Sequence, residues 1–156
     1  MVYETQAILR YLDDVFPVPA LEPKDPRAAA KMNQLMGVND WYLFQQVNRV
    51  IGFQRIVGPA LMGLTPDEAA IAAALPDAHR CLGVLEQLAG EGPFLTGAQF
   101  TLADVLIAPQ MDFVAATPEG AAILERSPRL TGWLERMRAR PSMQATLPPE
   151  MFRRAA

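Results

Sequence analysis

The 156-residue chain has one cysteine and one histidine, and each scarcity excludes a kind of site. A single cysteine forms neither an internal disulfide nor a cysteine-based zinc site, and it fits a reducing compartment. His79 alone excludes a histidine-rich metal site, so we predict no bound metal. No apolar run approaches the roughly 20 residues that cross a bilayer, and no basic segment followed by an apolar one opens the chain. We therefore expect a cytoplasmic protein without a membrane partner.

The sequence also lacks an excess of basic charge and any sustained alternation of apolar and polar residues. Its net charge is −3, and no basic stripe stands out, so nucleic acid is not an expected partner. The arginines within residues 136–140 alternate with apolar residues, which is typical of the solvated side of a last helix. Without period-two alternation no strand is predicted. Hydrophobic residues make up 51% of the chain, enough for one domain with its own core.

Proline marks where helices begin. In four places a residue with a capping side chain precedes a proline, which suits the first helical position because its missing N–H has no partner there anyway. These pairs are Asp25-Pro26, Thr65-Pro66, Thr117-Pro118 and Ser127-Pro128. Helices are predicted over about 4–16, 26–58, 66–88, 101–115, a short stretch after 118, and 128–140. Pro76 is expected to kink or break the third of these.

A capping box is the clearest local signal in the second half of the chain. Thr101 is placed to accept from the amide of Asp104, while the carboxylate of Asp104 reaches back to the amide of Thr101. Phe100 and Val105 occupy the flanking apolar positions that fix the entry angle of the chain. This box predicts a well-defined start for the helix over about 101–115.

Three motifs in this order resemble the cytosolic glutathione transferases. They are Glu4-Thr5-x-Ala7-Ile8-x-x-Tyr11-Leu12 ending in Phe16-Pro17, then Phe94-Leu95-Thr96-Gly97 with the Thr101–Asp104 box, then Ser127-Pro128-Arg129-Leu130-x-x-Trp133-Leu134. The resemblance covers nearly the whole chain. It implies an all-α fold, a helical bundle of the glutathione transferase C-terminal domain type, in which the box of Thr101 and Asp104 begins the central core helix. Residues 1–16 would be the last helix of a thioredoxin-like domain, 17–24 the interdomain linker, and 25–156 the helical domain.

The first predicted helix has an apolar face formed by Ala7, Ile8, Tyr11, Leu12 and Val15. Nothing before it supplies a surface to cover that face. We therefore expect the chain to begin inside a larger protein, with most of the N-terminal domain missing. The helix should then be displaced, pair with a copy of itself, or bury its face against another molecule.

The resemblance implies glutathione as co-substrate, no cofactor, and two kinds of binding residue. Glu4 and Thr5 match the pair that holds the γ-glutamyl end of glutathione, although the alternative is that they only cap a helix. The electrophile pocket is implied at Trp41, Tyr42, Gln45 and Arg49. Core or interface packing is the alternative for each aromatic residue. No residue is assigned to thiol activation, so no catalytic residue is predicted.

The function implied is that of a glutathione S-transferase, a homodimer that conjugates glutathione to an electrophilic, apolar substrate. The present chain should be inactive alone, because the family's thiol-activating residue lies in the thioredoxin-like domain. The alternative is a non-enzymatic helical module that docks other proteins or carries apolar ligands. Retention on immobilised glutathione distinguishes the two hypotheses.

Overall fold

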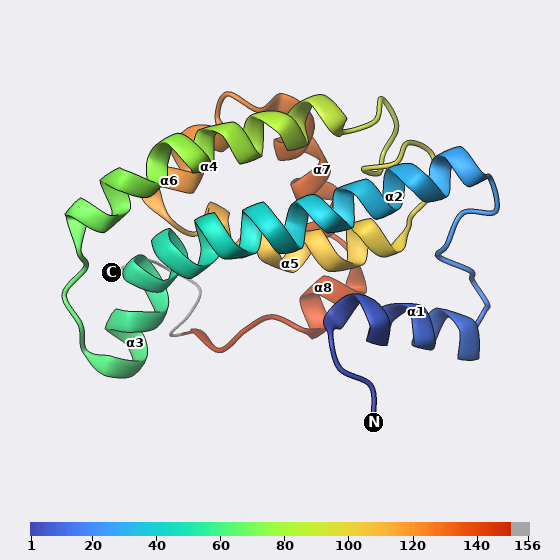
Figure 1. The fold of residues 1–156 in the computed structure, drawn as a ribbon, viewed down its shortest axis with the longest axis horizontal. Coiled ribbons are helices and arrows are strands. Elements are labelled where there is room, and N and C mark those ends of the chain that lie inside the picture. The colour runs from blue at the N-terminus through green and yellow to red at the C-terminus, as the bar shows by residue number, and fades with distance from the viewer. Residues whose placement is uncertain (151–156) are drawn as a thin grey trace.

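The computed structural model describes residues 1–150 as helices joined by short connections (Figure 1). The helices are α1 (Thr5–Val15), α2 (Pro26–Val38), η1 (Asn39–Val57), α3 (Gly58–Met62), α4 (Glu68–Leu88), α5 (Leu102–Ala115), α6 (Pro118–Leu124), α7 (Pro128–Arg138) and α8 (Pro141–Ala145). No strand forms within the described residues, which hold one isolated bridge between Phe94 and Gly97. The predicted all-α class is confirmed. The predicted domain boundaries remain a prediction.

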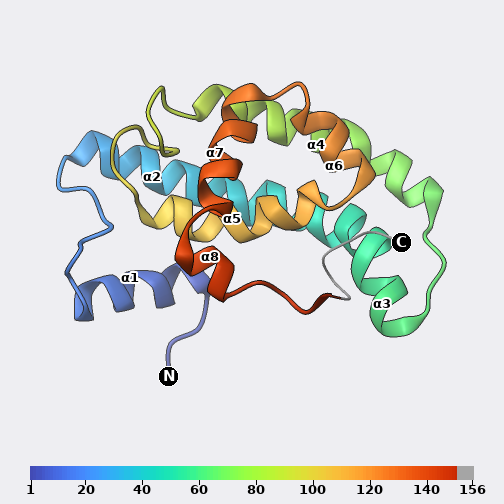
Figure 2. The same ribbon diagram turned by 180° about the vertical axis from the view of Figure 1, so that it is seen from behind.

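Helix α5 is the centre of the bundle. Its sequence is apolar on nearly every side, which is the pattern of a helix surrounded by others rather than of a surface helix. It contacts α1, α2, η1, α6 and α7. Figure 2 shows α5 running through the middle of the molecule, with α7 crossing it. The buried central helix that the family resemblance implies is therefore present.

Helices α2 and η1 form one continuous helical segment along the long dimension of the molecule, and α3 follows η1 and turns away at its far end (Figure 1). The sequence predicts one helix over most of this range, but its middle part is a π-helix with wider winding. The buried residues of η1 recur every four or five positions rather than at the α-helical 3.6. They include Asn39, Leu43, Val47, Ile51 and Ile56. This winding lets η1 keep one side packed against both α4 and α5.

Two of the four predicted caps are confirmed. Asp25 accepts from the amide of Ala28 at 2.8 Å at the start of α2. Thr117 Oγ1 accepts from the amide of Gly120 at 3.1 Å and donates to the carbonyl of Val114. Each of these side chains therefore satisfies an amide that the first helical turn leaves free.

The other two predicted caps are wrong. Helix α4 begins at Glu68, and Asp67 rather than Thr65 accepts from the first free amides, at 3.0 Å each. Ser127 donates its hydroxyl to the carbonyl of Ile123, so it makes no cap for α7. The free amides of α7 donate instead to the carboxylate of Glu86 on α4. A cap supplied from another helix leaves no local signal in the sequence.

Two other local expectations differ from the structure. Helix α4 continues through Pro76, an exposed residue, without a break. Helix α8 follows α7 directly from Pro141 and is not among the predicted helices. No helix within residues 1–150 is both long and apolar enough to cross a membrane.

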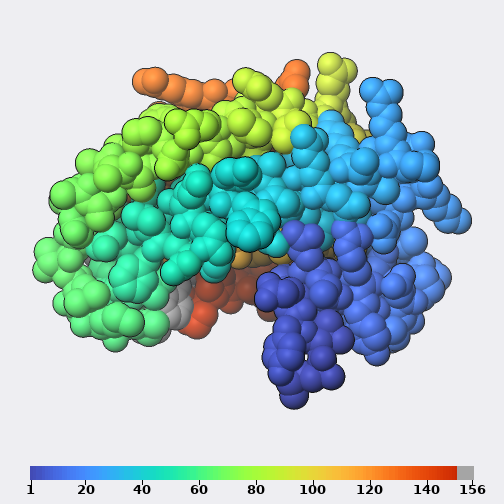
Figure 3. Space-filling model, in the orientation of Figure 1, coloured from blue at the N-terminus to red at the C-terminus, as the bar shows by residue number. Residues whose placement is uncertain are grey.

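Helix α1 lies against the bundle with a side that is polar apart from Leu9, which packs against the core. Gln6 Nε2 donates to Asp40 Oδ2 at 2.7 Å, and Arg10 Nη1 donates to Glu22 Oε1 at 2.9 Å. The carboxylate of Asp13 accepts from the amides of residues 21 and 22. The opposite side of the helix carries the exposed side chains Ile8, Tyr11, Leu12 and Val15. Figure 3 shows this N-terminal segment standing out from the body of the molecule.

Candidate functional site

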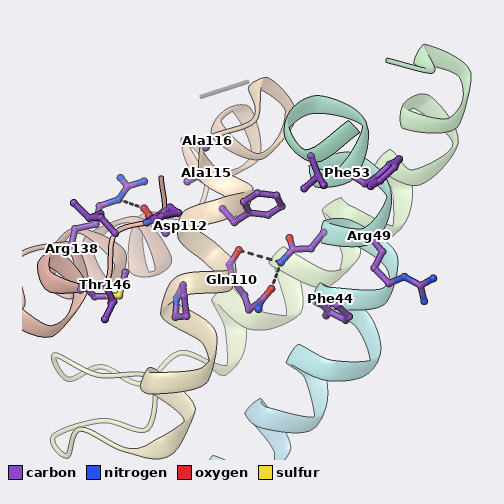
Figure 4. Close-up of a pocket in the computed structure, with 16 residues that line it drawn as sticks. Phe44, Arg49, Phe53, Gln110, Asp112, Ala115, Ala116, Arg138 and Thr146 are labelled. Carbon is purple, nitrogen blue, oxygen red and sulfur yellow. Dashed lines mark hydrogen bonds and ion pairs between the residues drawn. The ribbon is translucent and has the colours of Figure 1, made fainter. Parts of the chain in front are cut away.

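A cavity of about 1040 Å³ lies between η1 and α5, and α7, α8 and the segment after α8 complete its wall (Figure 4). Its lining side chains come from five stretches of chain. They are Phe44, Asn48, Arg49, Phe53 and Val57; Pro109, Gln110, Asp112, Phe113, Ala115 and Ala116; Arg138; Met143; and Thr146, Leu147 and Pro148. Most are apolar, with a few polar groups between them.

Three phenylalanine rings give the cavity its apolar character. Phe44 and Phe53 project from η1, and Phe113 projects from α5. Phe113 packs directly over Gly52, where a Cβ atom would lie 2.3 Å from ring atom Cε1. A glycine at position 52 is therefore what allows the Phe113 ring to occupy its place in the cavity wall.

The polar groups of the cavity are mostly engaged with each other. Asn48 Nδ2 donates to the main-chain carbonyl of Gln110 at 3.4 Å and to its side-chain Oε1. Arg138 Nε donates to Asp112 Oδ1 at 2.6 Å and so connects α7 to α5. The first contact joins η1 to α5, and the second joins α7 to α5. Figure 4 shows both contacts as dashed lines.

The structure brings one of the four predicted pocket residues into the cavity wall. Arg49 lines it, and Gln45 lies beside Arg49, accepting from its Nη1 at 2.6 Å. Trp41 and Tyr42 are not among the lining residues; they are 72% and 51% exposed on η1. The role predicted for these four residues remains a prediction.

The α5 side of the cavity is not predicted from the sequence. Gln110 and Phe113 belong to the helix that begins at the box of Thr101 and Asp104, and the apolar composition of this helix is typical of a core helix alone. Pro109, an exposed residue in the middle of this apolar helix, is the one local signal that its second half reaches a surface.

Glu4 and Thr5 lie at the N-terminal end of α1, and the structure gives them no partner in the cavity. Glu4 has φ 69° and ψ 126°, an unusual backbone conformation for a residue that is not glycine. Such conformations cost about 1–3 kcal/mol and cluster at functional sites. No side chain caps this helix end, so its first amides point outward unpaired by a side chain. Figures 1 and 2 both draw this end next to α8.

The predicted capping box is confirmed and is structural. Thr101 N–H donates to Asp104 Oδ2 at 2.9 Å, and both halves of the box are formed. The other carboxylate oxygen accepts from the amide of Leu95 and from the indole of Trp133, each at 2.9 Å. Asp104 and Thr101 are fully buried, so this carboxylate organises the core rather than a surface site.

Three titratable groups, Cys81, Arg55 and Glu68, have shifted pKa values, and none of them suits catalysis. Burial raises the pKa of the Cys81 thiol to about 12, which keeps it protonated and unreactive near neutral pH. Hydrogen bonds to Glu68 and Glu119 raise the pKa of Arg55, which remains a fixed cation. Among residues 1–150 there is no group of three or more histidine, cysteine, aspartate or glutamate side chains placed to hold a metal ion.

Comparisons with known proteins agree with this arrangement. Residues 68–136 match the family described as glutathione S-transferase, C-terminal domain. Glutathione S-transferase F14 of Arabidopsis thaliana is 29% identical over 150 residues, which make up 94% of this chain and 58% of that protein. Glutathione S-transferase 3 of Zea mays is 28% identical, over 94% of this chain and 66% of that protein. The structure of glutathione S-transferase III in its apo form superposes with a TM-score of 0.80 at 29% identity, over 95% of this chain and 70% of that one.

The chain thus spans 58% to 66% of the length of these two plant relatives. The family match runs from α4 to α7 and includes the box of Thr101 and Asp104 together with Trp133. The similarity in sequence and the similarity in structure both concern glutathione S-transferases, and the matched region contains these buried contacts. Residues 68–136 match the C-terminal domain of the glutathione S-transferase family, and the chain resembles members of that family in sequence and in fold.

Proposed function

We propose that this chain forms the electrophile-binding wall of a glutathione S-transferase that conjugates glutathione to an apolar substrate. The observation that carries the proposal is the phenylalanine-lined cavity between η1 and α5. Small-molecule sites are typically concave, mostly apolar and supplied with a few placed polar groups. Phe44, Phe53 and Phe113 provide the apolar surface, and Asn48 and Gln110 provide polar groups.

We also propose that the bundle is of the glutathione transferase C-terminal type. In this interpretation α1 is the last helix of a thioredoxin-like domain, and residues 17–24 are the linker between the two domains. The exposed apolar side chains Ile8, Tyr11, Leu12 and Val15 support it, because such a face suits packing against a sheet. A cytoplasmic location and a homodimer belong to the same proposal.

Glu4 and Thr5 are the proposed anchor for the γ-glutamyl end of glutathione. Two features support this role: the strained backbone of Glu4 and the uncapped N-terminus of an eleven-residue helix. Free amides and the positive end of the helix dipole attract a carboxylate, while the carboxylate of Glu4 suits an α-ammonium group. Asp40 holds this end of α1 against the bundle through its hydrogen bond with Gln6.

In the reaction the glutathione thiolate attacks the electrophilic carbon, a carbon–sulfur bond forms, and the leaving group departs with its electron pair. A thiolate at neutral pH requires a hydrogen-bond donor or a positive charge next to the sulfur. We assign no described residue to this step, and we expect the 156-residue chain alone not to catalyse it. Its contribution is to bind and orient the electrophile and to exclude water from it.

The test is binding of an apolar fluorescent probe, 8-anilinonaphthalene-1-sulfonate, and its displacement by S-hexylglutathione. We expect stoichiometric binding, competition by the glutathione derivative, and no conjugation of glutathione with a chromogenic aryl halide. Phe44→Asp should weaken probe binding at least several-fold, because it puts a charge in the apolar wall. Val84→Asp, at an exposed position of α4 outside the cavity, is the matched control. Equal affinities for the two variants, or no competition, would contradict the proposal.

A second candidate is a docking module without enzymatic activity. The exposed apolar side of α1 favours it, since a face of this kind also suits a protein partner. If the chain is a docking module, Phe44→Asp should not change the binding of the probe or of S-hexylglutathione. Retention of the chain on immobilised glutathione, lost in the double variant Glu4→Ala and Thr5→Ala, argues for the transferase.

A further inference from the structure

Asn48 is a buried amide in a wall that is otherwise dominated by aromatic rings. It is 5% exposed, and its side chain lines the cavity between η1 and α5. Its neighbours in that wall include Phe44, Phe53 and Phe113, none of which carries a side-chain hydrogen-bond donor. A polar group in such surroundings costs free energy unless each of its atoms has a partner.

The orientation of the Asn48 carboxamide is fixed by its neighbour on α5. Nδ2 donates to the main-chain carbonyl of Gln110 at 3.4 Å and to the side-chain oxygen of the same residue. A main-chain carbonyl only accepts, so the nitrogen and not the oxygen of Asn48 must face it. Oδ1 is thereby directed away from Gln110, and it is buried without any hydrogen-bond partner.

Three other donors of the cavity wall have partners elsewhere. Arg138 Nε donates to Asp112, Arg49 Nη1 donates to Gln45, and Thr146 Oγ1 donates to the carbonyl of Ser142. The chain thus leaves one buried acceptor next to an apolar cavity without supplying a donor for it. A bound molecule that brings a donor satisfies it.

We propose that Asn48 selects cavity ligands that combine an aromatic or apolar body with an N–H or O–H donor. This inference rests on the proposed function, because it names the substrate class of the same cavity. The rings of the wall accept the apolar body, and Asn48 Oδ1 accepts the donor. Asn48 Oδ1 is buried in the structure without ligand. The donor of a ligand therefore reaches Oδ1 only when a neighbouring side chain changes its rotamer. Phe44 lines the same wall and is 40% exposed, and exposed side chains change rotamer on a fast timescale.

The experiment compares two ligands that differ in one donor, 2-naphthol and 2-methoxynaphthalene, by calorimetric titration of the full chain. A neutral hydrogen bond to an otherwise unpaired acceptor corresponds to about three- to tenfold in affinity. We expect the wild type to bind 2-naphthol tighter by that factor. Asn48→Leu and Asn48→Ala should bind both ligands equally. Gln34→Ala removes an exposed amide of α2 and should keep the wild-type preference.

A second measurement needs no variant and covers the case in which the Asn48 variants unfold, which circular dichroism detects. The side-chain carbonyl ¹³C resonance of Asn48 should shift on saturation with 2-naphthol and not with the methyl ether. Three results would overturn the role of Asn48 and leave the proposed function untouched. They are equal affinities of the wild type for the two ligands, a preference for 2-naphthol that survives in both folded variants, and an Asn48 resonance that does not shift. If neither ligand binds the wild type, the proposed function of the cavity fails together with it.

Discussion

The indole Nε1 of Trp133 donates a hydrogen bond to Oδ1 of Asp104 across 2.9 Å, and both side chains are buried. Through this contact the first turn of α5 is joined to the middle of α7. The same carboxylate also accepts from the amides of Leu95 and Thr101 and from the hydroxyl of Thr101. One ionisable residue thus ties the central helix, the loop before it and a later helix together.

Replacing Asp104 with alanine should strongly destabilise the chain. The change leaves several buried donors without an acceptor, and each such loss typically costs about 1–3 kcal/mol. We expect the free energy of unfolding in urea to fall by about 3–5 kcal/mol, or the variant to be unfolded at 25 °C. Asp14→Ala, at an exposed position of α1, should change it by less than about 0.5 kcal/mol. Similar stabilities for the two variants would show that the carboxylate is dispensable.

Arg55 joins three helices through two carboxylates. Its guanidinium donates to Glu68 at the start of α4 at 2.6 Å and to Glu119 of α6 at 2.9 Å. Arg55→Met should lower the free energy of unfolding by about 1.5–3 kcal/mol, because it leaves the largely buried side chain of Glu119 without its cation. Arg55→Lys should not restore it, since one ammonium group cannot reproduce the fork of the guanidinium. Urea titrations of the three proteins at pH 7 provide the measurement.

The same network predicts how stability depends on pH. The hydrogen bond from Arg55 lowers the pKa of Glu68, so the folded state binds this proton less readily than the unfolded chain. The contribution of Glu68 is therefore present above its unfolded pKa of about 4.3 and is lost as the pH falls through the lower folded value. The stability difference between wild type and Glu68→Gln should shrink over that acidic interval. A difference that stays constant down to pH 3 would exclude the linkage.

Cys81 should be unreactive in the folded protein. Burial raises the pKa of its thiol to about 12, and the thiolate is the reactive form. With Ellman's reagent at pH 8 we expect no colour from the native chain and one equivalent in denaturing urea. Ser142→Cys adds an exposed thiol and should give one equivalent at once under native conditions. Rapid reaction of the unmodified native chain would mean that Cys81 is accessible.

Gly52→Ala should alter the cavity through Phe113. The new Cβ would lie 2.3 Å from ring atom Cε1, so the ring must leave its place. Overpacking of this kind costs about 1–3 kcal/mol of stability, and the displaced ring changes the cavity wall. We expect weaker binding of 8-anilinonaphthalene-1-sulfonate. Gly83→Ala, on α4 with open space around its Cβ, should leave both quantities unchanged.

The exposed apolar face of α1 should cause association of the isolated chain. Burying a few such side chains, at about 25 cal/mol per Å² of apolar area, contributes several kcal/mol. We expect light scattering to give a mass above that of one chain at tens of micromolar, and a lower mass for the double variant Ile8→Glu and Leu12→Glu. The control pair Ala72→Glu and Ala73→Glu adds the same charge on an exposed side of α4. A wild type that stays monomeric contradicts this prediction.

Part of the candidate site can be predicted from the sequence. The aromatic and polar residues at positions 41–55 point to the helix that forms one side of the cavity, and Arg49 does line it. The sequence does not indicate which residues of that helix face the cavity, because η1 winds as a π-helix and an α-helical period assigns the wrong side. Trp41 and Tyr42 therefore lie outside the lining, whereas Phe44, Asn48 and Phe53 lie within it.

By itself, the amino-acid sequence determined the all-α class, the approximate positions of the longer helices and the start of α5. These features follow from local interactions: apolar periodicity, proline at helix starts, and the reciprocal bonds of Thr101 and Asp104. Only the tertiary structure decided the cap that Glu86 gives to α7, the inward polar side of α1 and the cavity wall shared by Asn48 and Phe113. Each of these joins residues far apart in the chain, and the packing that brings them together leaves no pattern in either segment alone.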